Sequence, residues 1–380
     1  MTTLITNAHI VSPDLEIENG SILITNGKIT EVYPSDAELP VTNSSYDAAG
    51  NYVFPGFVDI HAHGADNKDV CDNDVESIRH IAQKKLQEGV TTWLPTTLTQ
   101  PQAKLLEIAG KCAEYMSNQE FCKTPGLHVE GPFINVSKAG AQNPEFVREP
   151  NFAELKELHD IAPATVFSLA PCQPNACEVI AAAKAIGISS SAAHSEATAA
   201  QIFAAKDAGL THLTHYGNAM TPLHHREIGM VGSGLLDDDI KLELICDEIH
   251  LAPDFLKLIF KIKPIEQLIM ITDSMAGSWI NNGECQLGGL DVVVEDKVAR
   301  LKNGGALAGS TLIFNEGVAN VYKLTGLPLW QIVKATSWNQ AESLGLENIG
   351  RIEEGFCADL AVLDKDFQVV QTFVDGVAKL

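Results

Sequence analysis

The middle of the chain shows two patterns of apolar and polar residues, one typical of strands and one typical of helices. Short apolar runs, typical of buried strands, cover eight segments: 52–60, 90–94, 126–130, 165–169, 188–193, 210–214, 242–246 and 267–272. Apolar residues that recur every three or four positions predict helices at 75–88, 175–186, 198–208 and 253–261. Eight strands that alternate with helices predict an α/β fold, a (β/α)8 TIM-like barrel.

Short strands and hairpin turns fill both ends of the chain. Near the N-terminus two apolar runs precede Asn26-Gly27, a favoured hairpin dipeptide. Near the C-terminus Asp375-Gly376 follows a similar run. Neither end could hold a core alone. We therefore expect one small β-sandwich domain formed by both chain termini, residues 1–53 and 346–380, beside a barrel of residues 54–345.

One glycine-rich segment, from about 277 to 306, interrupts this alternation after the last predicted strand. It contains Asn303-Gly304-Gly305, a sequence typical of hairpin turns. We expect this segment to cover the barrel mouth as a lid.

The composition limits the possible binding partners and the cellular compartment of the protein. The net charge of −23 argues against nucleic acid or an anionic membrane surface as a partner, and an anionic substrate would need a local positive charge. The eight cysteines include no CxxC pair and fit reduced thiols of a cytoplasmic protein. We expect no signal peptide, and no apolar run approaches the roughly 18 residues of a membrane span.

Side chains that bind metals stand where predicted strands end. His61 and His63 follow the first strand, and Glu130 closes the third. Three more follow the fifth, sixth and eighth strands: His194, His215 and Asp273. Histidines at i and i+2 face the same side of a strand, and the strands of a barrel all end at one mouth. Histidine and carboxylate ligands without cysteine suit Zn²⁺, Fe²⁺ or Mn²⁺ in hydrolysis, so the sequence predicts a metal-dependent hydrolase.

Ordinary structural interpretations exist for each of these residues. Glu130 could cap a helix or form a salt bridge in a loop, and Asp273 could bind the metal, transfer a proton, or do both. A lone buried histidine is usually structural. We interpret His128 as a group inside the barrel or behind the ligands, and His212 as structural.

Six segments in order carry a family resemblance. They are PGFVDIHAHG (Pro55–Gly64), HVEGPF (His128–Phe133), KAGAQNP (Lys138–Pro144), HYGNAM (His215–Met220), ITDSMAG (Ile271–Gly277) and LAGS (Leu307–Ser310). They resemble the amidohydrolase superfamily and, within it, the N-acetylglucosamine-6-phosphate deacetylases. The resemblance implies hydrolysis of N-acetyl-D-glucosamine 6-phosphate to D-glucosamine 6-phosphate and acetate by a metal-activated water.

The resemblance also implies a set of metal ligands. Glu130, His194 and His215 would hold the main catalytic metal, and His61 and His63 would complete a second site that Glu130 bridges. One or two divalent ions per subunit are both compatible with this set. Zn²⁺ is the first choice, with Fe²⁺, Mn²⁺ or Co²⁺ as alternatives.

Roles in catalysis and substrate binding follow from the same resemblance. Asp273 would be the general acid and base, and His250 would polarise the acetamide carbonyl. Arg226 would reach the neighbouring subunit's site and bind the phosphate there, which would make a homodimer necessary for tight binding. The other implied substrate contacts are Ala141, Gln142, Asn218, Ala219, Leu307, Ala308 and Gly309.

Two positions depart from the family pattern. Gln142 stands where many relatives carry a histidine; it can hydrogen-bond a sugar but cannot titrate. Glu248 stands where glycine is common, and its carboxylate would repel a phosphosugar unless it turned away. Three alternatives stay open: deacetylation of N-acetyl-D-galactosamine 6-phosphate, deacetylation of another N-acyl amine, and a non-catalytic barrel that serves as a scaffold.

Overall fold

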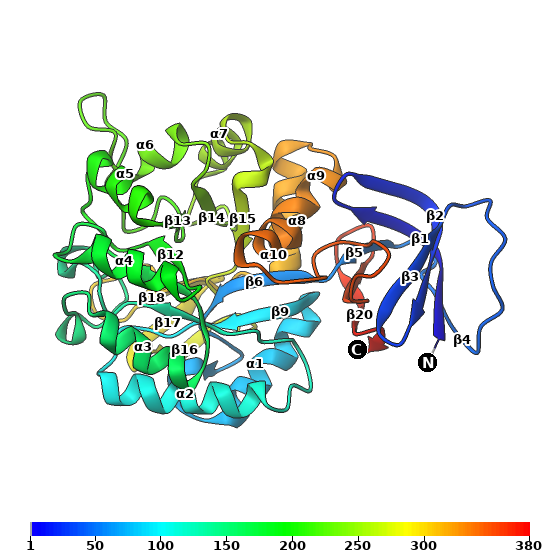
Figure 1. Cartoon of the computed structure of the whole chain (residues 1–380), viewed down its shortest axis with the longest axis horizontal. Coiled ribbons are helices and arrows are strands. Elements are labelled where there is room, and N and C mark those ends of the chain that lie inside the picture. The colour runs from blue at the N-terminus through cyan, green and yellow to red at the C-terminus, as the bar shows by residue number, and fades with distance from the viewer. Residues whose placement is uncertain (1) are drawn as a thin grey trace.

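A closed barrel of parallel strands forms the centre of the computed structural model, which describes residues 2–380 (Figure 1). Its strands are β6 (Phe57–Ala62), β9 (Val90–Pro95), β10 (Leu127–Glu130), β11 (Ala164–Leu169), β12 (Ser189–Ala192), β13 (Leu210–Leu213), β14 (Lys241–Ile245) and β15 (Leu268–Ile271). Strands β10 to β15 form one sheet and β6 pairs with β9. Bridges between Thr96 and His128, and between Ala62 and Ser274, close the ring. The predicted (β/α)8 barrel is confirmed.

Helices cover the outside of this barrel (Figure 1). They are α1 (Val75–Gln87), α2 (Gln102–Met116), α3 (Phe152–Ile161), α4 (Ala176–Ala185), α5 (Ala199–Ala208), α6 (Gly229–Leu236), α7 (Pro253–Ile262), α8 (Phe314–Thr325), α9 (Leu329–Val333) and α10 (Asn339–Leu344). The four predicted helices correspond to α1, α4, α5 and α7. No helix in residues 2–380 is long and apolar enough to cross a lipid bilayer.

The two chain termini together build the second unit, a sheet beside the barrel. Its strands are β1 (Thr2–Ser12), β2 (Leu15–Thr25), β3 (Lys28–Tyr33), β4 (Ser44–Asp47), β5 (Tyr52–Pro55), β19 (Leu360–Leu363), β20 (Val369–Val374) and β21 (Val377–Ala378). Strand β5 pairs with both β1 and β19, so the C-terminal strands continue the sheet of the N-terminal strands. Ile29 of β3 and Phe373 of β20 share one core although they lie towards opposite ends of the strand order, so the sheet curls on itself. The proposed domain limits remain a prediction.

The segment 52–60, predicted as one strand, forms two strands that belong to different sheets. Its first half, β5, belongs to the terminal sheet, and its second half, β6, belongs to the barrel. Gly56 separates them, and a Cβ at this position would lie 2.2 Å from the side chain of Thr91. Only glycine permits this close approach. An apolar run alone does not show that its two halves enter different sheets.

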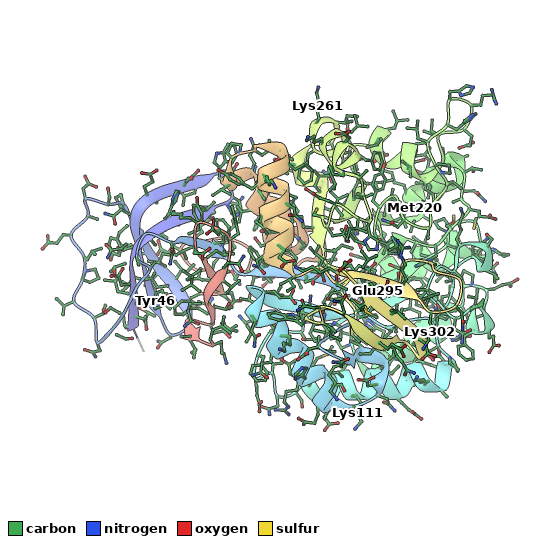
Figure 2. The ribbon with its side chains drawn as sticks, turned by 180° about the vertical axis from the view of Figure 1, so that it is seen from behind. Tyr46, Lys111, Met220, Lys261, Glu295 and Lys302 are labelled. Atoms are coloured by element: carbon green, nitrogen blue, oxygen red, sulfur yellow. The ribbon has the colours of Figure 1, made fainter. Side chains whose placement is uncertain are left out.

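The glycine-rich insertion forms an antiparallel sheet of three strands, β16 (Gly283–Leu287), β17 (Leu290–Glu295) and β18 (Val298–Leu301). Figure 2 shows Glu295 and Lys302 on this sheet, against the barrel and away from Tyr46 of the terminal sheet. Leu287 and Ala306 of this segment line the central cavity. The insertion is therefore part of the cavity wall, and its movement as a lid remains a prediction.

Candidate active site

A cavity of about 340 Å³ opens where the barrel strands end. Most of the residues singled out in the sequence line it: His63, Glu130, Ala141, Gln142, His194, His215, Asn218, Ala219, His250, Asp273, Leu307 and Gly309. His61 and Ala308 are fully buried and are not part of the lining. Arg226 lies outside the cavity on an exposed loop, where its Nη1 is 2.8 Å from Nε2 of His225.

Three of the predicted ligands form an equilateral triangle. Oε1 of Glu130 lies 3.1 Å from Nε2 of His194 and 3.1 Å from Nε2 of His215, and the two nitrogens are 3.1 Å apart. A tetrahedral Zn²⁺ ion with bonds of about 2.0–2.1 Å would separate its ligand atoms by roughly 3.3 Å. The triangle therefore has the size of one face of such a site.

A second, looser triangle uses the other oxygen of Glu130. Nε2 of His61 lies 3.2 Å from Nε2 of His63, and Oε2 of Glu130 is 3.8 Å and 3.4 Å from these two nitrogens. Oδ1 of Asp273 lies 3.5 Å from His61 and 3.3 Å from His63. Glu130 thus offers one oxygen to each triangle, and Asp273 adds a fourth donor to the second.

The hydrogen bonds of the histidine Nδ1 atoms determine whether the Nε2 atoms can bind a metal ion. Nδ1 of His194 donates to the carbonyl oxygen of Lys138 at 2.8 Å, and Nδ1 of His63 donates to that of Thr96 at 3.1 Å. In the neutral rings Nε2 then carries a lone pair and no proton. When these two rings are neutral, their lone pairs face the carboxylate of Glu130, and acceptors that face one another repel. A cation resolves this arrangement, and the residues fit a divalent metal ion.

Electrostatics at the cluster also favour a positive charge. Burial raises the pKa of Glu130, but the neighbouring histidines, His61 first, outweigh it and hold that pKa well below its usual range. Burial lowers the pKa of His63, but the carboxylates of Asp273 and Glu130 raise it to about 10. The carboxylates are therefore ionised at neutral pH, and the site requires cationic charge beside them.

The backbone at three of these residues lies in an uncommon region. His194, His215 and Asp273 each stand two residues beyond the end of a barrel strand and have φ values of 43°, 34° and 50°. A positive φ is rare for residues other than glycine, and such strain gathers at functional sites. A hydrogen bond from the Asp273 backbone N to the carbonyl oxygen of His61, 2.8 Å long, helps to hold this geometry.

His250 is held by a carboxylate that the sequence did not single out. Nδ1 of His250 lies 2.6 Å from Oδ2 of Asp247, which leaves Nε2 as the ring nitrogen available to a substrate. The spacing of three residues just after β14 is the signal that could have found Asp247. Glu243, inside β14, was also missed; it is a carboxylate between two buried leucines of the strand.

The two departures from the family pattern have different surroundings. Gln142 donates from Nε2 to Oε2 of Glu130 at 2.6 Å, and its Oε1 accepts from the backbone N of Thr99 at 2.6 Å. Its side chain therefore braces a predicted metal ligand as well as lining the cavity. Glu248 is exposed and is not part of the lining, and its φ of 63° is one that glycine adopts without cost.

Comparison with known proteins defines the class. Residues 52–379 match the model of the Amidohydrolase family, and the chain belongs to this family of metal-dependent hydrolases. The predicted resemblance to the amidohydrolase superfamily is thereby confirmed.

Particular relatives are similar along their whole length. The chain is 32% identical to the N-acetylglucosamine-6-phosphate deacetylase of Lysinibacillus sphaericus, over 99% of this chain and 97% of that protein. It is 33% identical to the N-acetylgalactosamine-6-phosphate deacetylase of Escherichia coli O157:H7, over 99% of both. The solved structure of a variant N-acetyl-D-glucosamine-6-phosphate deacetylase from Mycobacterium smegmatis, in complex with N-acetyl-D-glucosamine 6-phosphate, is 28% identical. Its TM-score is 0.94, over 100% of this chain and 99% of that one.

Proposed function

We propose that this protein hydrolyses N-acetyl-D-glucosamine 6-phosphate to D-glucosamine 6-phosphate and acetate. The observation that carries the proposal is a complete amidohydrolase ligand set in a chain that matches a deacetylase bound to this phosphosugar with a TM-score of 0.94. Water adds to the acetamide carbon, the bond between carbon and nitrogen breaks, and the amine leaves with a proton.

Glu130, His61, His63, His194 and His215 are the proposed metal ligands. Their nitrogen and oxygen donors favour Zn²⁺, and Fe²⁺, Mn²⁺ and Co²⁺ suit the same set. A divalent ion bound there would lower the pKa of water to about 7 and polarise the carbonyl oxygen.

Two cavity residues carry the proton transfers and the charge in this proposal. Asp273 takes the proton from the attacking water and returns it to the leaving amine, because its ionised carboxylate lies next to the ligand cluster. His250 donates to the carbonyl oxygen as negative charge develops on it, and Asp247 fixes the orientation of the ring.

Binding of the phosphate suggests a role for a second subunit. Lys138 is the one lysine or arginine among the residues that line the cavity, and the chain as a whole carries a net charge of −23. We propose a homodimer in which the exposed Arg226 reaches the cavity of the neighbouring subunit. Arginine binds phosphate through two parallel hydrogen bonds, which lysine cannot match. The remaining substrate contacts proposed are Ala141, Gln142, Asn218, Ala219, Leu307, Ala308 and Gly309.

The cytoplasm is the proposed location. All eight cysteines are free thiols in the structure, as in proteins of reducing compartments.

Acetate release tests the proposal. Metal-loaded protein is assayed with N-acetylglucosamine 6-phosphate, its galacto epimer and unphosphorylated N-acetylglucosamine. We expect the highest kcat/KM with the gluco phosphosugar, and activity that disappears with a chelator. Preference for the galacto epimer would change the substrate, and metal-loaded protein without activity on any N-acyl amine would contradict the proposal.

A further inference from the structure

Directly beneath the ligand cluster the barrel interior is polar. Barrel interiors are usually filled by branched apolar side chains. Here a chain of hydrogen bonds crosses from one side to the other. It runs from Nε2 of His128 to Ser168 at 2.7 Å, on to Thr214 at 2.7 Å, to Ser191, and finally to Oε1 of Glu243 at 3.1 Å. All five side chains are fully buried.

The second oxygen of Glu243 has no hydrogen-bond partner within the described structure. This atom, Oε2, faces Nδ1 of His61 at 3.7 Å, and that nitrogen is also without a partner. Both side chains are fully shielded from solvent. A buried carboxylate oxygen and a buried ring nitrogen that face each other unpaired are costly, and a small turn of the imidazole would join them.

Two nearby histidines, His128 and His212, do not need this carboxylate. The ring nitrogens of His128 already contact the carbonyl oxygen of Ile60 at 2.8 Å and Ser168. The ring nitrogens of His212 are likewise occupied, by Thr211 at 2.7 Å and Ser343 at 2.9 Å. Nδ1 of His215 is also without a hydrogen-bond partner, but the ring nitrogen that Oε2 of Glu243 faces at 3.7 Å is that of His61.

A third metal site at His61, His128 and Glu243 is the competing interpretation. Their donor atoms lie within 4.8 Å of one another. However, an ion there would have to displace the hydrogen bond of His128 to Ile60 or to Ser168. Nε2 of His61 also belongs to the looser triangle at the mouth. The geometry favours a carboxylate that supports a ligand over a third ion.

We propose that Glu243 is a positioning residue that accepts a hydrogen bond from Nδ1 of His61 and so aims Nε2 of His61 at the second metal site. The chain would then bind two ions per subunit, with the tighter triangle filled first. This inference rests on the proposed metal-dependent function but not on the identity of the substrate. A carboxylate behind a ligating histidine fixes the ring and raises its basicity, and loss of such a partner weakens metal binding about 10- to 100-fold.

The first test is metal binding by the purified full chain with Glu243→Gln. Zn²⁺ content is measured by mass spectrometry, and affinity is measured by competition with a chelator. We expect one ion to bind as in the unchanged protein and the second to bind about 10- to 100-fold more weakly. Wild-type affinity for both ions in folded Glu243→Gln protein would overturn the inference.

A double-substitution cycle with His61→Asn separates positioning from a general loss of packing. His61→Asn alone removes the second site. If Glu243 acts through His61, adding Glu243→Gln to His61→Asn leaves the affinity of the remaining site unchanged. Ser191→Ala is the matched control, because it removes the hydrogen bond to Oε1 of Glu243 and leaves Oε2 in place. A further loss of affinity in the double variant would contradict a role through His61.

A spectroscopic measurement covers the case in which Glu243→Gln does not fold. In the unchanged, Zn²⁺-loaded protein, NMR of ¹⁵N-labelled histidine reports the proton on Nδ1 of His61, and the signal is assigned by its absence in His61→Asn. We expect a slowly exchanging, strongly hydrogen-bonded proton. A rapidly exchanging proton, or none, would overturn the inference. Acetate release measured on the same samples tells a failure of the proposed substrate apart from a failure of this contact.

Discussion

The mouth of the barrel and the interior just beneath it use histidine in opposite ways. At the mouth, carboxylates outweigh burial and raise the pKa of His63 to about 10. Beneath it, burial lowers the pKa of His212 to about 4, and Thr211 and Ser343 contact its two ring nitrogens at 2.7 Å and 2.9 Å. Carboxylates beside a histidine favour positive charge there, as a proton on the ring or as a metal ion, whereas a histidine among hydroxyl groups stays neutral and links segments by hydrogen bonds.

This contrast separates function from stability. The mouth gathers like-charged carboxylates and the strained backbone of His194, His215 and Asp273, which stability alone would not favour. The interior joins its buried polar side chains by hydrogen bonds, with Oε2 of Glu243 left unpaired. Substitutions at the mouth should therefore reduce activity with little loss of stability, and substitutions in the interior, Glu243 excepted, should do the reverse.

The largest effect is expected at Glu130, the one residue shared by both triangles. Glu130→Gln removes the negative charge that each cation needs. We expect loss of tightly bound metal and a decrease in kcat/KM of about 1000-fold or more, which corresponds to several kcal/mol of lost transition-state stabilisation. Metal content and acetate release are measured together, with the exposed Glu295→Gln as control. Retained metal with near-normal turnover would remove Glu130 from the centre.

Asp273→Asn distinguishes proton transfer from metal binding at the mouth. The amide keeps the size of the side chain but cannot take a proton from water. We expect kcat to fall by about 10²- to 10⁴-fold while the Glu130–His194–His215 triangle keeps its ion. Turnover close to that of the unchanged enzyme would exclude Asp273 as the general base.

Gln142→Ala tests whether Gln142 supports the metal ligand Glu130 or binds the sugar. The substitution removes the donor that contacts Oε2 of Glu130 at 2.6 Å. If Gln142 acts through Glu130, we expect metal affinity to fall by about 10-fold and kcat to fall with it. If it mainly binds the sugar, KM rises while metal affinity stays constant. Steady-state kinetics at saturating metal, together with chelator competition, distinguish the two outcomes.

The smallest expected effect is an acid-dependent loss of stability from the interior. His212 has a folded-state pKa of about 4, below the 6.5 of an unfolded chain. The unfolded state therefore binds more protons between these values, and stability present above pH 6.5 is lost as the pH falls toward 4. His212→Asn should make this decline shallower by up to about 1.4 kcal/mol per pH unit.

Urea unfolding of metal-free protein at several pH values from 7 to 4.5 measures this difference. The exposed His224→Asn serves as the matched control. An equal decline in His212→Asn and in the unchanged protein would show that His212 does not contribute to the acid sensitivity.

Much of the fold was predictable because strands and ligands leave local signals. All eight barrel strands coincide with predicted strand segments, and each predicted ligand stands at the end of one or within two residues beyond it. Helix α2 was missed although Leu105, Ile108 and Cys112 face the core at helical spacing. Helix α6 offers no such signal, because it is rich in glycine and buried on most sides.

Supporting contacts of the site could not be predicted because they depend on tertiary neighbours. Glu243 is far from His61 in the sequence, and its free oxygen is recognisable only once the barrel has closed. Gln142 was predicted to contact the sugar, and its hydrogen bonds to Thr99 and Glu130 depend on how two loops meet the end of β10. The ligands themselves stand at strand ends, so the pattern of predicted strands was enough to find them. The residues that support them have no fixed position relative to the strands.

Titration of metal-free protein with Zn²⁺, while acetate release from N-acetylglucosamine 6-phosphate is followed, tests the central claim most directly. We predict no turnover without metal and activity that rises as the Glu130–His194–His215 triangle fills. Further change is expected as the second triangle fills. Acetate release by fully metal-free protein, or metal-saturated protein that leaves the phosphosugar intact, would contradict this account.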